Sequence, residues 1–191
     1  MTYLLNAVAL LVTLAFNAAI ALFVLRLAAE ASRADFNNPL SQFIYRTTNP
    51  VLAPLRRALP NWRRINFAAL LLAYLLVLLK RLAVFALDGF MPHLSGLLVL
   101  ALADLLDFVL LFYLVVVFGW SLLSMLSNDS YHPLQRLLGA IAAPLVRPLR
   151  GRLTIGMLDF SPTVVMIGLL LARILIAAPL SDLGMRLALV G

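Results

Sequence analysis

Long apolar stretches without charge constrain this chain more than any other feature. Residues 1–25 contain no Asp, Glu, Lys or Arg, and residues 65–79 and 108–128 are also uncharged. A helix of about 20 apolar residues is long enough to cross the hydrocarbon core of a bilayer. Of the 191 residues, 64% are hydrophobic and only 12% are charged, against about 25% charged in a typical soluble domain. The chain is therefore predicted to be an integral membrane protein and not a soluble globular enzyme.

Four membrane spans are predicted from these stretches, at about residues 3–26, 66–88, 103–126 and 160–178. The predicted fold class is an all-α membrane protein with about four transmembrane helices. Residues 94–103 leave two alternatives open: this apolar segment could form a short interfacial or re-entrant helix, or it could extend the third span. A cleavable signal peptide is not expected, because the first stretch is too long and lacks a basic start.

Basic residues are concentrated in the two connectors between paired spans, residues 27–65 and 127–159. Counted from Arg26, these connectors hold 11 of the 15 Lys and Arg residues of the chain. Positively charged residues favour the cytoplasmic side of a membrane. We therefore expect both connectors in the cytoplasm and both termini on the periplasmic side.

The chain is predicted to contain one transmembrane hairpin twice, in residues 1–93 and 94–191. A shift of 94 residues places Asp35 on Asp129. The same shift places three motif prolines, Pro39, Pro50 and Pro54, on Pro133, Pro144 and Pro148. These matches lie in polar connectors, where apolar composition does not account for them. A unit with an even number of spans keeps its orientation, so we expect parallel repeats related by an axis along the membrane normal.

The connector motifs resemble those of the YggT family. The first copy is carried by Asp35-Phe36-Asn37-Asn38-Pro39 and by Thr48-Asn49-Pro50-Val51-Leu52-Ala53-Pro54-Leu55-Arg56-Arg57-Ala58-Leu59-Pro60. The second is carried by Ala143-Pro144-Leu145-Val146-Arg147-Pro148-Leu149-Arg150 and by Leu158-Asp159-Phe160-Ser161-Pro162. The sequence departs from the family pattern at Gly151, where a second arginine is usual, and at Thr154, where a proline is usual. The second connector is therefore expected to make the weaker anionic contacts.

The resemblance covers essentially the whole chain and implies a small multi-pass protein of the bacterial inner membrane. Bacterial members of the family are linked to osmotic-shock tolerance and potassium balance, and some are linked to cell division. Plastid relatives are linked to cytochrome maturation and nucleoid distribution. Because no agreed biochemical activity accompanies the family, the resemblance implies architecture more than mechanism.

Each connector is predicted to begin with an amphipathic helix of roughly ten residues, too short to span a bilayer. Asn38 is a candidate N-cap before Pro39, and the following proline pair is expected to break the helix. The predicted apolar faces consist of Leu40, Phe43, Ile44 and Thr47 in the first copy and of Leu134, Leu137, Leu138 and Ile141 in the second. An apolar face beside arginines and an interfacial tryptophan is typical of a helix that lies among lipid headgroups.

The connector residues predicted to contact anionic lipid or a partner protein are mostly arginines. They are Arg46, Arg56, Arg57, Trp62, Arg63, Arg64, Arg136, Arg147, Arg150 and Arg152. Each arginine near an anionic surface contributes on the order of 1 kcal/mol to membrane attraction. The connector helices could instead only cap the helical bundle. A nucleic-acid partner is not expected, because that function needs a larger basic patch with aromatic platforms.

Ionisable residues also fall within the predicted spans, where each is energetically costly. A shift of 93 residues places Lys80 on Arg173, and each lies 14 residues past the start of its span. Asp104 and Asp107 lie at a similar predicted depth, on one face of their helix. The predicted intramembrane cluster is Lys80, Asp104, Asp107 and Arg173, with Thr13 and Asn17 on the first span. It is interpreted either as structural bonding between helices, with Lys80 and Arg81 reaching the outer interface, or as an ion or proton pathway.

Enzyme chemistry is not indicated by the residue pattern. The chain has no cysteine, and its two histidines, His93 and His132, cannot alone form a usual metal site. No Ser/His/Asp group or glycine-rich phosphate loop is apparent, so we expect no catalytic residues, cofactor or metal. The favoured hypothesis is a non-enzymatic scaffold that contacts phospholipids, with a second copy or a cell-division protein as a further partner. The alternative is a small ion transporter, which would need to be oligomeric because four spans are few to line a path.

Overall fold

The structure is a computed structural model, and it describes residues 2–59, 66–126, 132–151, 153–155 and 158–190. The helices in this part of the chain are α1 (Thr2–Ala31), α2 (Pro39–Ala58), α3 (Phe67–Leu87), α4 (Leu94–Leu126), α5 (Pro133–Val146), α6 (Ser161–Ala172) and α7 (Ala178–Val190). A π-helical turn, Arg173–Ala177, joins α6 to α7 without a break. Two short antiparallel strands, β1 (Thr154–Ile155) and β2 (Leu158–Asp159), precede α6.

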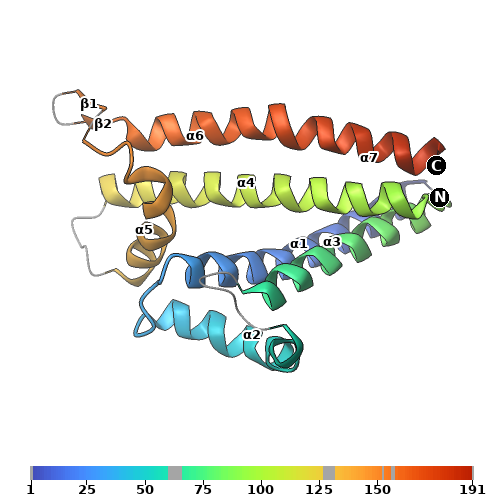
Figure 1. Cartoon of the computed structure of the whole chain (residues 1–191), viewed down its shortest axis with the longest axis horizontal. Helices are drawn as coiled ribbons and strands as arrows, with labels where there is room; N and C mark the ends of the chain where they lie inside the picture. The colour runs from blue at the N-terminus through green and yellow to red at the C-terminus, as the bar shows by residue number, and fades with distance from the viewer. Residues whose placement is uncertain (1, 60–65, 127–131, 152, 156–157, 191) are drawn as a thin grey trace.

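Four helical segments are long and apolar enough to cross a membrane: Tyr3–Ala31, Phe67–Leu87, Leu94–Leu126 and Ser161–Leu189. This arrangement confirms the predicted all-helical, multi-pass class. In Figure 1, α1 packs beside α3 and α4 packs beside α6 and α7, while contacts between α3 and α4 join the two pairs. Both termini lie at one end of the molecule, and the short helices α2 and α5 lie toward the other (Figure 1). That second end, with α2 and α5, is called the connector end below.

Two of the long helices extend beyond the predicted spans. Helix α4 begins at Leu94, so the segment 94–103 extends the third long helix and is not a separate interfacial or re-entrant helix. The last helix continues to Val190, whereas the predicted span ends at residue 178. The π-helical turn explains this continuation. Pro179 has no N–H and its ring clashes with the carbonyl four residues before it, and the wider turn, in which the Ala178 N–H donates to the Arg173 carbonyl, accommodates the ring within the helix.

Helices α4 and α7 approach each other closely at two glycines. A Cβ atom on Gly96 would overlap the backbone of Leu187 and Ala188, and a Cβ on Gly184 would lie 2.8 Å from the Leu100 nitrogen. The His93 N–H also donates to the Ala188 carbonyl at 3.2 Å. Small residues permit such backbone contact between membrane helices.

We therefore expect the substitution Gly96→Ala to separate α4 from α7 and to destabilise the protein by about 1–3 kcal/mol, the usual cost of overpacking. The measurement is thermal unfolding of the purified protein in a mild detergent. Gly168→Ala is the matched control, because Gly168 is also helical and a Cβ there would meet nothing within 4 Å. Equal melting temperatures for the two variants would contradict the prediction.

Helix α2 corrects two predictions for the first connector. The helix has 20 residues and continues through both Pro50 and Pro54, so the proline pair does not end it. Its buried face is also rotated from the predicted one: Ser41, Ile44, Thr48 and Leu52 are buried, whereas Phe43 is 63% exposed. A proline inside a helix removes one backbone hydrogen bond and can kink the helix without ending it, and α2 changes direction along its length in Figure 1. In α5, Pro144 likewise lies inside the helix.

The predicted N-cap at Asn38 is confirmed. Its side-chain oxygen accepts the Leu40 N–H at 2.9 Å, and Pro39 occupies the first helical turn. The same side chain donates from Nδ2 to the Pro133 carbonyl at 2.7 Å, at the start of α5. His132 caps α5 in the corresponding way, through Nδ1 and the Leu134 N–H at 3.3 Å. Asn38 therefore both starts α2 and ties the two connectors together.

Candidate functional site

Two bidentate ion pairs connect α4 to the helices on its two sides. Arg173 donates to Asp107 from Nε to Oδ1 at 2.7 Å and from Nη2 to Oδ2 at 2.9 Å. Arg81 donates to Asp104 from Nε to Oδ2 at 2.5 Å and from Nη2 to Oδ1 at 2.7 Å. The planar guanidinium matches both carboxylate oxygens, which makes these pairs directional as well as charged. One pair thus links α3 to α4, and the other links α4 to the π-helical turn.

Lys80 bonds to Asn17, another member of the predicted cluster, but it forms no ion pair with either aspartate. Its Nζ donates to Asn17 Oδ1 at 3.2 Å and so connects α3 to α1, while the neighbouring residue Arg81 pairs with Asp104. Successive residues point about 100° apart around a helix, so only one of these two cations can face α4. Thr13 lies one turn before Asn17 on α1, half-exposed, and its side chain has no hydrogen-bond partner among the described residues.

A cavity of about 260 Å³ lies beside the two aspartates. Its lining includes Asp104, Asp107, Ser181 and Asp182, together with alanines of α4 and of the π-helical turn. Both Asp104 and Asp107 already bind arginines, which leaves Asp182 without a charged partner among the described residues. Within the part of the chain that the structure describes, no group of three or more His, Asp or Glu residues is arranged to hold a metal ion.

A second polar network lies at the connector end and centres on Glu30, which the sequence reasoning missed. The Glu30 carboxylate accepts from Arg26 Nη2 at 2.7 Å, from Arg56 Nη2 at 2.7 Å and from Asn66 Nδ2 at 2.8 Å. Arg26 is 1% exposed, and its guanidinium carbon lies 3.3 Å from the centre of the Tyr45 ring. The network therefore joins α1, α2 and the first residue before α3. The available signal in the sequence was that Glu30 is the one glutamate of the chain.

The network also changes the chemistry of Tyr45. Burial raises the pKa of the Tyr45 hydroxyl, and the negative charge of Glu30 raises it further. The phenol therefore stays neutral at physiological pH and serves as a ring on which Arg26 stacks.

The structure divides the predicted connector arginines into two groups. Arg56 forms an ion pair with Glu30, and Arg136 forms one with Asp35, each at 2.7 Å. The exposed arginines without an ion pair among the described residues are Arg46, Arg57, Arg147 and Arg150. Trp62, Arg63, Arg64 and Arg152 lie outside the described residues. The first group therefore holds the connectors in place, and the second remains free to meet an external anion.

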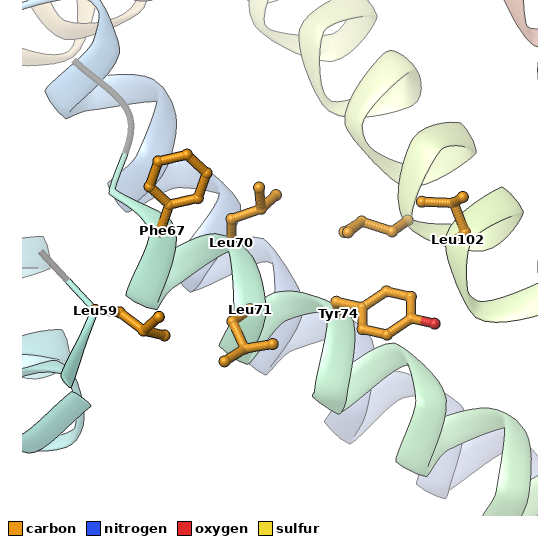
Figure 2. Close-up of a pocket in the computed structure, with 7 residues that line it drawn as sticks. Leu59, Phe67, Leu70, Leu71, Tyr74 and Leu102 are labelled. Carbon is orange, nitrogen blue, oxygen red and sulfur yellow. The ribbon is translucent and has the colours of Figure 1, made fainter. Parts of the chain in front are cut away.

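Helix α2 carries two of these exposed arginines, Arg46 and Arg57, and also exposed apolar side chains. Phe43 is 63% exposed and Val51 is 47% exposed, and Arg46 and Arg57 are exposed on the same helix. Nearby, an apolar groove of about 370 Å³ runs between the end of α2, α3 and α4. Figure 2 shows the residues that line it, Leu59, Phe67, Leu70, Leu71, Tyr74 and Leu102. Tyr74 turns its hydroxyl to the Leu98 carbonyl at 3.0 Å, so the groove presents hydrocarbon.

The geometry defines an all-helical protein with four helices that could cross a membrane, with two Arg–Asp ion pairs within those helices and with exposed arginines at the connector end. The chain belongs to the CCB3/YggT family, whose model matches residues 1–87 and 99–180. The resemblance seen in the connector motifs is thereby confirmed.

The curated relatives have no assigned activity in their names. The chain is 35% identical over 175 residues to an uncharacterized protein in the proC 3' region of Vibrio alginolyticus, which covers 89% of this chain and 93% of the relative. It is 33% identical over 189 residues to the uncharacterized protein YggT of Escherichia coli K12, covering 96% of this chain and 93% of the relative. It is 35% identical over 159 residues to the uncharacterized protein PA0392 of Pseudomonas aeruginosa, covering 80% and 79%. No solved structure matches the chain.

Proposed function

We propose that this protein is a non-enzymatic scaffold of the bacterial inner membrane whose connector end binds anionic phospholipid headgroups. The observation that carries the proposal is that α2 exposes both apolar side chains, Phe43 and Val51, and arginines without an ion pair among the described residues, Arg46 and Arg57. Apolar side chains that enter the headgroup region beside arginines that attract phosphate are what an interfacial helix needs. The connector end then faces the cytoplasm, and both termini face the periplasm.

The physiological role that follows is in osmotic-stress tolerance and potassium homeostasis, or in the organisation of the envelope during cell division. These roles come from the family resemblance and would act through headgroup binding, a second copy or a membrane partner. The order apolar spanning helix, connector helix, apolar spanning helix occurs twice along the chain, which supports the proposed tandem repeat. The ion pairs Arg81–Asp104 and Arg173–Asp107 support a structural use of those four charges.

The double substitution Arg46→Gln/Arg57→Gln is expected to reduce the retention of phosphatidylglycerol about thirtyfold, because each of the two arginines contributes on the order of 1 kcal/mol to attraction by an anionic surface. The measurement is the lipid that remains bound in native mass spectrometry after extraction in a mild detergent. The matched control is Arg186→Gln, an exposed arginine of α7 at the end that holds the termini. Retention by Arg46→Gln/Arg57→Gln equal to that of the unchanged protein would reject the proposal. Loss in Arg186→Gln alone would place the lipid at the end that holds the termini.

A second candidate function is ion transport, and one observation favours it. The cavity beside Asp104, Asp107 and Asp182 opens next to the π-helical turn, and π-helical turns are frequent at functional sites. Ion flux into liposomes that contain the purified protein tests this function. Asp182→Asn is the informative variant, because it leaves both ion pairs intact. Flux that requires Asp182 would favour the transporter over the scaffold.

A further inference from the structure

Two adjoining hollows lie at the connector end around Arg147. The larger, about 490 Å³, lies between the end of α1 and α5, and its walls include Ser32, Arg33 and Pro144. The smaller, about 230 Å³, is lined by Trp120, Gly139 and Arg150 among others. Ala143 and Arg147 line both. We call the joint feature the arginine cleft and define it by Arg33, Arg147, Arg150 and Trp120.

The arginine cleft holds three guanidinium groups and little opposing charge. The side chains of Arg33, Arg147 and Arg150 form no ion pair with any other described residue, and the Arg150 guanidinium lies 5.9 Å from the centre of the Trp120 ring. Asp159 is the acid within range of Arg150, and it already accepts the Ser161 N–H at 2.9 Å. The remaining walls are mainly small residues, so the cationic groups border open space. An excess of positive charge around a cavity selects an anion.

Arg33 adopts a backbone conformation that an arginine rarely takes. Its φ is +52°, and it terminates α1 in a Schellman motif: its own N–H donates to the Glu30 carbonyl at 3.1 Å, and the Ala34 N–H donates to the Ala29 carbonyl at 2.9 Å. Glycine is the usual residue at this position, and a side chain there costs about 1–2 kcal/mol. The chain thus carries a strained arginine where glycine would be more stable, and strained backbone of this kind clusters at ligand sites.

We propose that the arginine cleft binds a phosphate-bearing anion with about two negative charges. Guanidinium groups donate paired hydrogen bonds to phosphate oxygens, and three of them match a diphosphate better than a single phosphodiester. The phosphates belong either to a lipid headgroup or to a free diphosphate. This inference deepens the proposed function, because it gives the connector end one specific site besides the general attraction of α2 to headgroups.

The test uses the full chain in nanodiscs of zwitterionic phosphatidylcholine. The protein has two tryptophans, so in a Trp62→Phe background the fluorescence reports on Trp120 in the arginine cleft. The titrants are cardiolipin, which carries two phosphates, phosphatidylglycerol, which carries one, and inorganic pyrophosphate. We expect a saturable change in Trp120 emission with cardiolipin or pyrophosphate, at concentrations at which phosphatidylglycerol has little effect. Saturation by pyrophosphate assigns a free anion, and saturation by cardiolipin alone assigns a lipid.

Arg33→Gly distinguishes a loss of binding from a loss of folding, because it is expected to weaken phosphate binding without lowering the melting temperature. Glycine suits a positive φ, so the melting temperature should stay the same or rise. Loss of one charged hydrogen-bond donor should weaken binding about tenfold. Arg147→Gln should weaken binding similarly, and Arg186→Gln should not.

The inference is overturned if neither cardiolipin nor pyrophosphate changes Trp120 emission. It is also overturned if Arg33→Gly and Arg147→Gln bind as tightly as the unchanged protein. Failure here leaves the proposed function testable on its own, since Arg46→Gln/Arg57→Gln addresses phosphatidylglycerol retention on α2 and leaves the arginine cleft unaltered.

Discussion

Replacement of Glu30 by glutamine is expected to lower the free energy of unfolding by about 3–5 kcal/mol, the cost of breaking a buried ion pair from one side. The Glu30 carboxylate accepts from both Arg26 and Arg56, and the Asn66 side chain completes its shell. Without that carboxylate, the Arg26 guanidinium stays 1% exposed with no counter-charge. Its Nε and Nη1 already have no hydrogen-bond partner, and its remaining contacts are the neutral Tyr45 ring and the Asn49 side-chain oxygen at 3.3 Å. Thermal unfolding in a mild detergent measures the effect.

The matched control for Glu30→Gln is Arg136→Gln, which breaks the ion pair between Arg136 and Asp35. Those side chains are 50% and 37% exposed, so the loss should stay below about 1 kcal/mol. If Glu30→Gln melts at the temperature of the control, the network around Glu30 does not hold the connector to α1.

The second large effect is expected for Asp107→Asn. The substitution removes the charge that neutralises Arg173, and an unpaired arginine within a membrane span costs about 3 kcal/mol. We expect less protein in the membrane fraction and a lower melting temperature in detergent. Asp107→Asn retains nearly the same shape, so the change in charge accounts for the difference.

A double substitution determines whether the charges at this position act only structurally. Asp107→Leu/Arg173→Met replaces both members of the pair by apolar side chains, and exchanges of this kind are often neutral or stabilising. Recovery of stability, together with growth under osmotic shock in a strain that lacks the native gene, would assign the pair a structural role. Recovery of stability without growth would favour the transporter, and no recovery of stability would contradict the pairing itself.

The architecture was largely predictable from the sequence because the apolar stretches are long. A window of about 20 apolar residues tolerates several residues of error at each end, and the four long helices follow directly. The ends were less predictable. Residues 178–190 contain Asp182 and Arg186, and these charges lower the apolar character by which a span is predicted. The segment is nevertheless helical and packs on α4 through Gly184.

The choice between neighbouring cations was not predictable. Lys80 and Arg81 are adjacent in the sequence, and the rotation of α3 against α4 decides which one meets Asp104. That rotation is set by packing across the interface, which no pattern within α3 reveals. The Arg26–Glu30 pair is four residues apart on α1 and could have been predicted from the sequence, whereas the bonds from Arg56 and Asn66 to Glu30 depend on how the connector folds back.

The position of α4 between two basic partners has a consequence for biosynthesis. Arg81 is made 23 residues before Asp104, so α3 reaches the bilayer before α4, the helix that carries its neutralising carboxylate. Asp107 is made 66 residues before Arg173, so α4 also reaches the bilayer before the helix that carries its partner. Each charge that enters alone carries a cost of about 3 kcal/mol until its partner arrives. Membrane insertion and assembly are therefore coupled in this chain, and α4 is the helix whose arrival completes the first pair and prepares the second.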